Sequence, residues 1–177
     1  VLTVVFGLPL GLLLVSSSKT GLRPRPALNH VLGAIVNVVR SFPFIILIVA
    51  LIPLTRLITG TSLGWQATVV PLTIGAIPFF ARLVESNVAA VPAGKIEAAQ
   101  MLGASPLQIQ WGVQVREARA QLIHSVTLLL ITLVGYSAMA GAVGGGGLGQ
   151  MAINYGYVRF QNDVMVVTVV VIIILVQ

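Results

Sequence analysis

Long apolar runs separated by short polar segments are the dominant pattern of this 177-residue chain. A helix needs about 20 mostly apolar residues to cross a membrane. Two internal runs reach that length, a third is short and is expected to extend back towards Arg40, and the runs at the two ends are interpreted as truncated spans. The pattern predicts an all-α polytopic membrane bundle of five spans, at residues 1–15, 44–58, 63–88, 122–142 and 164–176.

The polar segments between these runs are expected to be loops and turns. Pro43 disfavours helix at Phe42, so residues 40–43 are predicted to form an elbow at the membrane surface. Pro71, Gly75 and Pro78 are spaced to kink the 63–88 helix and to admit close neighbours. The remaining connections are expected to be a basic loop at residues 16–30, a tight external turn at 60–64, a flexible turn at 141–150 and an external loop at 154–160.

The composition supports an integral membrane protein. Hydrophobic residues make up 57% of the chain and charged residues 8%, whereas soluble domains carry about 25% charged residues. The mean hydropathy is +1.03. No polar region is long enough to fold alone, so residues 1–177 are predicted to be one membrane domain.

The longest segment that could not lie in a membrane is residues 92–119. Pro92 suits the first turn of a helix, residues 95–102 are mostly good helix formers, and Gly103 can adopt a left-handed stop. Ser105-Pro106-Leu107-Gln108 then has an N-cap, a proline at the first helical position and a capping-box glutamine. The segment is therefore predicted to be two short helices joined by a tight turn, a shape that another protein could bind.

Basic residues are distributed unequally between the predicted sides of the membrane. The predicted cytoplasmic segments hold Lys19, Arg23, Arg25, Arg40, Arg82, Lys95, Arg116 and Arg119, and the external ones hold Arg56 and Arg159. This bias agrees with the positive-inside rule. It places the amino end outside, the carboxyl end inside, and the 92–119 loop in the cytoplasm. The formal net charge of +6 is thus explained by orientation, and no nucleic-acid partner is expected.

Two groups of polar residues within the spans have competing interpretations. Arg82 and Glu85 lie three apart, which favours an intrahelical ion pair over a role in passing substrate. Ser125, Thr132, Tyr136 and Met139 share one helical stripe. Such a stripe either lines a translocation pathway or holds neighbouring helices together.

No catalytic, metal-binding or cofactor-binding residues are expected. Gly144-x-Gly146-x-x-Gly149 matches a dinucleotide fingerprint literally, but it follows a membrane helix and lacks the acidic residue that should come about 20 positions later. There is no P-loop motif, so this chain is not predicted to hydrolyse ATP itself. His30 and His124 are isolated, and the chain has no cysteine, so Cys-ligated metal is excluded.

The pattern Glu97-Ala98-Ala99-x-x-x-Gly103 resembles the EAA loop of bacterial ATP-driven importers, a loop that docks into a groove on a cytoplasmic ATPase. The physical logic fits, because Ala98, Ala99 and Gly103 allow close approach of another backbone. Glu97 adds a negative charge that the dipole near the start of a helix would favour. An ordinary surface helix and a DNA-binding helix-turn-helix are the alternatives.

Further stretches resemble the permease subunits of methionine importers. They are residues 40–47, Gln66-Ala67 with 70–76, Pro78-Phe79-Phe80-Ala81-Arg82, and 132–139, Thr-Leu-Val-Gly-Tyr-Ser-Ala-Met. The resemblance implies a multi-pass protein of the bacterial inner membrane, embedded in lipid, that forms a homodimer. It also implies two ATPase subunits, an external substrate-binding protein and methionine as substrate. Docking would fall on Glu97, Ala98, Ala99 and Gly103, and Met139 would form an apolar constriction.

One stretch departs from that family. The second loop helix usually closes with Leu-Pro-Glu-Ala, and here the matching residues are 115–118, Val-Arg-Glu-Ala. Without the proline, the helix could continue into the fourth span, and Arg116 adds a charge beside the docking surface.

Three other functions remain as alternatives. Another amino acid could replace methionine. A secondary transporter driven by an ion gradient would usually carry ionisable residues deep in its spans, and the predicted span centres contain none. A structural membrane scaffold would not need the paired capped helices.

Overall fold

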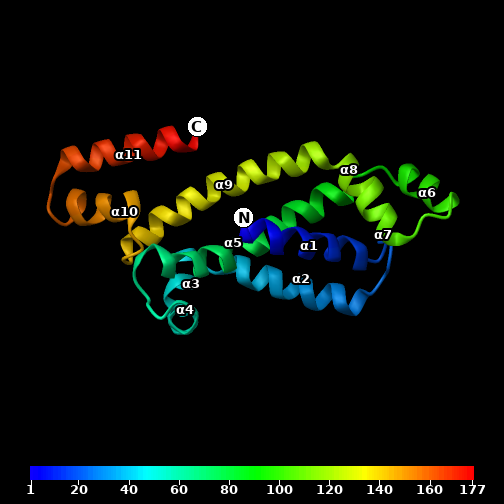
Figure 1. Cartoon of the computed structure of the whole chain (residues 1–177), viewed down its shortest axis with the longest axis horizontal. Helices are drawn as coiled ribbons and strands as arrows, with labels where there is room; N and C mark the ends of the chain where they lie inside the picture. The colour runs from blue at the N-terminus through cyan, green and yellow to red at the C-terminus, as the bar shows by residue number, and fades with distance from the viewer. The chain divides into compact units, whose positions relative to one another are not determined.

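The structure is a computed structural model that describes residues 1–177, and it is helical throughout (Figure 1). This confirms the predicted all-α class. The helices are α1 (Leu2–Ser17), α2 (Pro26–Ser41), α3 (Phe44–Ala50), α4 (Ile52–Thr59), α5 (Gly64–Ala89), α6 (Ala93–Met101), α7 (Pro106–Ile109), the π-helix η1 (Gln110–Gln114), α8 (Val115–Glu117), α9 (Arg119–Ala142), α10 (Gly147–Met151), the π-helix η2 (Ala152–Tyr157) and α11 (Asn162–Val176).

The chain divides into two compact units, each built from two separate stretches of sequence. Unit 1 contains Val1–Ser41 and Ile77–Leu129, and unit 2 contains Phe42–Ala76 and Leu130–Gln177. Helices α5 and α9 each contribute one half to each unit.

Two helical segments are long and apolar enough to cross a membrane, α5 and the segment Arg119–Tyr157 that begins with α9. A third is counted if α2 and α3 form one broken span. Helices α1 and α11 are apolar but shorter, with 16 and 15 residues. The predicted helices over 63–88 and 122–142 are therefore confirmed at spanning length.

The predicted elbow is confirmed, but the single helix predicted over residues 44–58 is wrong. Helix α2 ends at Ser41 and α3 begins at Phe44. The chain then leaves the helix at Leu51 (φ −88°, ψ 1°) and resumes as α4. Pro53 is the physical reason, since it has no N–H to donate and its ring clashes with the carbonyl four residues earlier. Proline is tolerated in the first turn of α4, where it lies.

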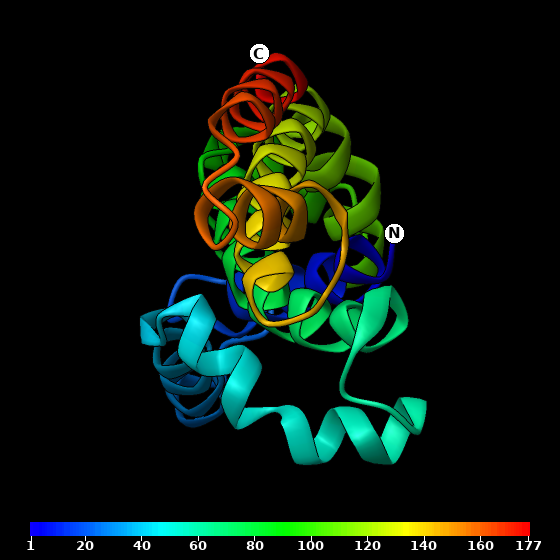
Figure 2. The same ribbon diagram turned by 90° about the vertical axis from the view of Figure 1, so that its left-hand side faces the viewer.

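Three predicted loops are partly helical. The loop predicted over residues 16–30 ends at Arg25, because Pro26 starts α2, a position that proline favours. Most of the turn predicted over 141–150 belongs to the end of α9 and to α10. The loop predicted over 154–160 lies largely in η2, which packs against α11 (Figure 2). A Cβ on Gly156 would lie 2.9 Å from Cβ of Met165, so this contact with α11 explains why a polar segment is helical.

Glycine allows close helix packing in both units. In unit 1, Gly7 and Gly11 are one turn apart on α1, and a Cβ on them would lie 2.9 Å from the Phe80 ring and 2.6 Å from Val84. This small-xxx-small arrangement brings α1 against α5. In unit 2, a Cβ on Gly75 would lie 3.0 Å from Leu47, which confirms the expected close neighbour.

Candidate functional site

Helix α6 carries the EAA-type residues and contains no buried residue. At its end, Met101 and Leu102 are 89% and 88% exposed. Isolated helices of fewer than about 12 residues are marginal in water, so this nine-residue helix depends on its ends and on a few contacts with the rest of unit 1. Its outer surface is therefore available to a partner.

The end of α6 is fixed by a Schellman motif at Gly103. The Gly103 N–H donates to the Gln100 carbonyl at 2.9 Å, and the Ala104 N–H donates to the Ala99 carbonyl at 3.1 Å. Gly103 has φ +77°, a conformation that only glycine adopts without strain. This confirms the predicted left-handed stop.

The second helix begins with the predicted capping box. The Gln108 N–H donates to Ser105 Oγ at 3.4 Å, and the Ser105 N–H donates to Gln108 Oε1 at 2.8 Å. Pro106 occupies the first helical position. The two short helices and their turn are thus defined by local interactions that can be predicted from the sequence.

The four predicted docking residues lie on α6 and its turn. Glu97, Ala98 and Gly103 are exposed, and Ala99 is half-buried. The dipole argument for Glu97 is wrong, because α6 begins at Ala93 and its first turn holds no acidic residue. The dipole effect is confined to the first turn, so Glu97 is an exposed carboxylate that the helix dipole does not stabilise.

One contact links the two ends of the 92–119 loop, and another joins the loop to α1. Lys95 on α6 forms an ion pair with Glu117 on α8. The buried Gln110 side chain donates to the Leu12 carbonyl of α1 at 2.8 Å. The sequence gives no signal for either contact, since the partners are 22 and 98 residues apart.

The departure at residues 115–118 lies at the join with the fourth predicted span. Only Ala118 (φ −81°, ψ 0°) separates α8 from α9, so the helix nearly continues, as the absence of proline allows. Arg116 is exposed there.

A cavity of about 290 Å³ lies between α6 and the loop that follows α1. Ile96, Glu97 and Gln100 line it from α6. Gln114 lines it from η1, is 4% exposed, and its Oε1 has no hydrogen-bond partner. Residues 93–100 therefore have one surface exposed to solvent and another that lines this cavity.

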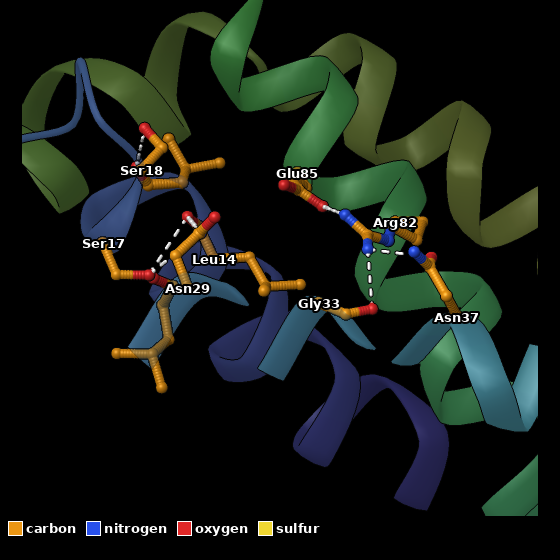
Figure 3. Close-up of polar contacts among 10 residues, drawn as sticks. Leu14, Ser17, Ser18, Asn29, Gly33, Asn37, Arg82 and Glu85 are labelled. Atoms are coloured by element: carbon orange, nitrogen blue, oxygen red, sulfur yellow. Dashed lines mark hydrogen bonds and ion pairs between the residues drawn. The ribbon is translucent and has the colours of Figure 1, made fainter. Parts of the chain in front are cut away.

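The predicted pair Arg82–Glu85 is confirmed and extends further than expected (Figure 3). Arg82 Nη1 lies 2.6 Å from Glu85 Oε2, and Arg82 Nη2 donates to the Gly33 carbonyl at 3.0 Å and to Asn37 Oδ1 at 2.9 Å. The arginine thus holds α2 against the C-terminal half of α5. Asn29 makes a second link in the same view, from its Nδ2 to the Leu14 carbonyl at 2.7 Å.

The four stripe residues of α9 have different surroundings. Ser125 is buried, and its Oγ accepts a hydrogen bond from Asn87 Nδ2 of α5 at 2.7 Å. Tyr136 stacks on Phe44, with ring centroids 4.2 Å apart. Thr132 is half-buried, and Met139 is 48% exposed. Ser125 therefore holds two helices together, which was the alternative to lining a pathway.

The chain matches one protein family along almost its whole length. The model of the binding-protein-dependent transport system inner membrane component matches residues 7–176. The probable D-methionine transport system permease protein MetI of Vibrio cholerae is 56% identical over 171 residues, which are 97% of this chain and 76% of that protein. Its counterpart in Haemophilus influenzae is 46% identical over 176 residues, 99% of this chain and 83% of that protein.

Solved structures agree. A structure described as an inward-facing conformation of the MetNI methionine ABC transporter gives a TM-score of 0.97 at 49% identity, over 99% of this chain and 81% of that one. An amino acid ABC transporter shares the fold, with a TM-score of 0.72 at 18% identity, over 99% of this chain and 81% of that one. These matches confirm the resemblance that the EAA-type loop indicates: the chain belongs to the binding-protein-dependent transport system inner membrane components, and within them to the MetI-type permease subunits of ABC transporters.

Proposed function

We propose that this chain forms the translocation pathway of an ATP-driven methionine importer and docks through α6 onto a separate cytoplasmic ATPase. The docking proposal rests on one observation above all, that α6 has no buried residue. The assignment of methionine is supported by the 56% identity to a probable D-methionine permease. The external binding protein then delivers the substrate.

The proposed assembly is a homodimer of five-span subunits with two ATPase subunits. Each subunit has its amino end outside and its carboxyl end in the cytoplasm, so that α6 faces the compartment that holds ATP. The excess of basic residues on the predicted cytoplasmic segments supports this orientation. In the docked state Glu97 offers the ATPase one charge, while Ala98, Ala99 and Gly103 let its backbone approach.

Coupling is proposed to be a rigid-body movement. Closure of the two ATPase subunits draws the paired α6 helices together. The movement passes to α8 through the Lys95–Glu117 pair and to α1 through the Gln110 hydrogen bond. Since only Ala118 separates α8 from α9, displacement of the loop moves α9 as well, and the spans rock about the dimer axis.

The pathway is proposed to lie along the stripe of α9 at Thr132, Tyr136 and Met139. Met139, nearly half exposed in one subunit, forms an apolar constriction near the dimer axis. Ser125 lies on the same stripe but contributes by holding α5.

A gradient-driven transporter is the competing function. Proton or sodium coupling generally uses ionisable residues deep in the spans. In α5 the ionisable residues are Arg82 and Glu85, within its last eight positions, and in α9 they are Arg119 and His124, within its first six. The central parts of both helices carry none, which favours ATP coupling.

The test is co-purification of the full-length protein from its native membrane. We expect a P-loop ATPase to accompany it and to be lost when Glu97 and Gly103 are both substituted. A protein that purifies alone and moves methionine into liposomes without ATP would refute the docking proposal and favour the gradient-driven transporter.

A further inference from the structure

A second cavity of unit 1, of about 310 Å³, lies between α1, the start of α2 and the α7–η1 segment. This second cavity is separate from the 290 Å³ cavity beside α6, and none of the predicted docking or pathway residues lines the second cavity. Its volume falls at the lower end of the range for small-molecule sites, about 300–1,000 Å³. Its chemistry differs between its two ends.

One end of this cavity is apolar. Pro9, Leu12 and Leu13 contribute from α1, and the seven residue steps from Pro9 to Ser16, whose carbonyl accepts from the Arg23 N–H, span about 10 Å along the helix. Leu107 and Trp111 face them from α7 and η1 and are 56% and 50% exposed. A large apolar surface left open beside a predicted membrane span needs an apolar occupant, because its exposure to water is unfavourable.

The other end is cationic. Arg23 and Arg25 line it, and their backbone N–H groups donate to the carbonyls of Ser16 and Ser17 at 2.9 and 3.0 Å. The two side chains therefore project from a backbone that is anchored to the end of α1. The two ion pairs of the chain involve other residues, and no carboxylate lines this cavity.

We propose that this cavity binds an anionic phospholipid of the cytoplasmic leaflet, with its phosphate at Arg23 and Arg25 and the upper part of an acyl chain along α1. Guanidinium groups bind phosphate oxygens bidentately, and basic pockets at the cytoplasmic ends of spans suit anionic headgroups. Tryptophan is enriched where a protein meets the headgroup region, and Trp111 lines this cavity. A soluble anion would leave the apolar half uncovered, and an apolar peptide would leave both arginines unpaired. The four residues proposed to dock the ATPase lie outside this cavity.

The test is native mass spectrometry of the delipidated full-length protein, with the subunits that co-purify, titrated with phosphatidylglycerol or phosphatidylethanolamine. We expect tighter binding of the anionic lipid, weakened about fivefold by Arg23→Gln or Arg25→Gln and about 25-fold by both. Ser16→Phe, which fills the cavity, should weaken both lipids. Arg40→Gln removes an exposed arginine outside the cavity and should change neither.

Three results would overturn the lipid site. The first is equal affinity of the unmodified protein for the two lipids, and the second is unchanged phosphatidylglycerol affinity in the double variant. The third is displacement of the lipid by millimolar inorganic phosphate, which would indicate a site for soluble anions. If the second result is accompanied by loss of the ATPase from the double variant, the cavity is assigned to protein docking. An ATPase that never co-purifies refutes the proposed function alone.

Discussion

Gly103 provides the sharpest test of docking, because two physical reasons for a glycine can be separated there. The first is conformational, since φ is +77° and an ordinary L-residue pays about 1–2 kcal/mol in the left-handed region. The second is close approach of a partner. Within the chain itself, a Cβ at Gly103 would meet nothing within 4 Å. A Cβ at this position has no contact within its own chain, so we expect an effect of side-chain volume to come from a partner subunit.

Asparagine separates the two reasons, because it tolerates the left-handed conformation better than other side chains. Gly103→Asn should keep the turn and still add volume at the contact. If the ATPase packs there as a core does, the extra atoms cost about 1–3 kcal/mol, which is about a 5- to 150-fold loss of coupling. Gly103→Val adds full backbone strain and should be worse. Methionine uptake into proteoliposomes should fall while ATP hydrolysis continues uncoupled.

Gly60 is a matched control. It ends α4 with φ +75°, and a Cβ there would also meet nothing within 4 Å, but it lies in the turn predicted to be external. Gly60→Asn should transport normally. Normal uptake by Gly103→Asn would refute packing of the ATPase at this glycine. An equal loss in Gly60→Asn would show that the defect lies in folding or insertion.

Three further predictions concern other contacts. Met139→Ala should either leak solute or alter uptake in proteoliposomes, and a variant that does neither would remove Met139 from the pathway. Ser125→Ala deletes the hydrogen bond from Asn87 and should lower stability by about 1 kcal/mol, measured as a lower midpoint of thermal unfolding in detergent; no shift would mean that the α5–α9 contact does not depend on it. Glu117→Gln breaks the ion pair with Lys95. The side chains of Glu117 and Lys95 are 43% and 50% exposed, so the free energy of unfolding should change by less than about 1 kcal/mol while the coupling of ATP hydrolysis to uptake weakens. Unchanged coupling would argue against transmission through that pair.

Features set by neighbouring residues could be predicted from the sequence. The capping box at Ser105 and Gln108, the left-handed stop at Gly103 and the elbow before Phe44 all depend on residues within a few positions of one another. The break at Leu51 was equally local, because Pro53 signals it. The apolar run on both sides of Pro53 obscures that signal, because its composition favours one continuous span.

Features set by distant residues could not be predicted. The spacing of three predicts the ion pair of Arg82 with Glu85, but the bonds of Arg82 to Gly33 and Asn37 join residues 49 and 45 positions apart. The helical conformation of residues 152–157 depends on packing against α11, which outweighs the local preference of a polar segment containing asparagine and glycine for a loop.

The same distinction explains why the 92–119 loop, which we propose docks the ATPase, is the part of the chain that the sequence predicts best. A helix that offers its outer surface to a partner cannot be stabilised by burying that surface in its own subunit, so local devices must hold its shape. The Schellman motif after α6 and the capping box before α7 are such devices. The long-range contacts of this loop are the Lys95–Glu117 pair, which links its two ends, and the Gln110 bond to α1, and we propose that these contacts pass movement onward. Local sequence thus shapes the contact surface, and tertiary contacts connect it to the spans.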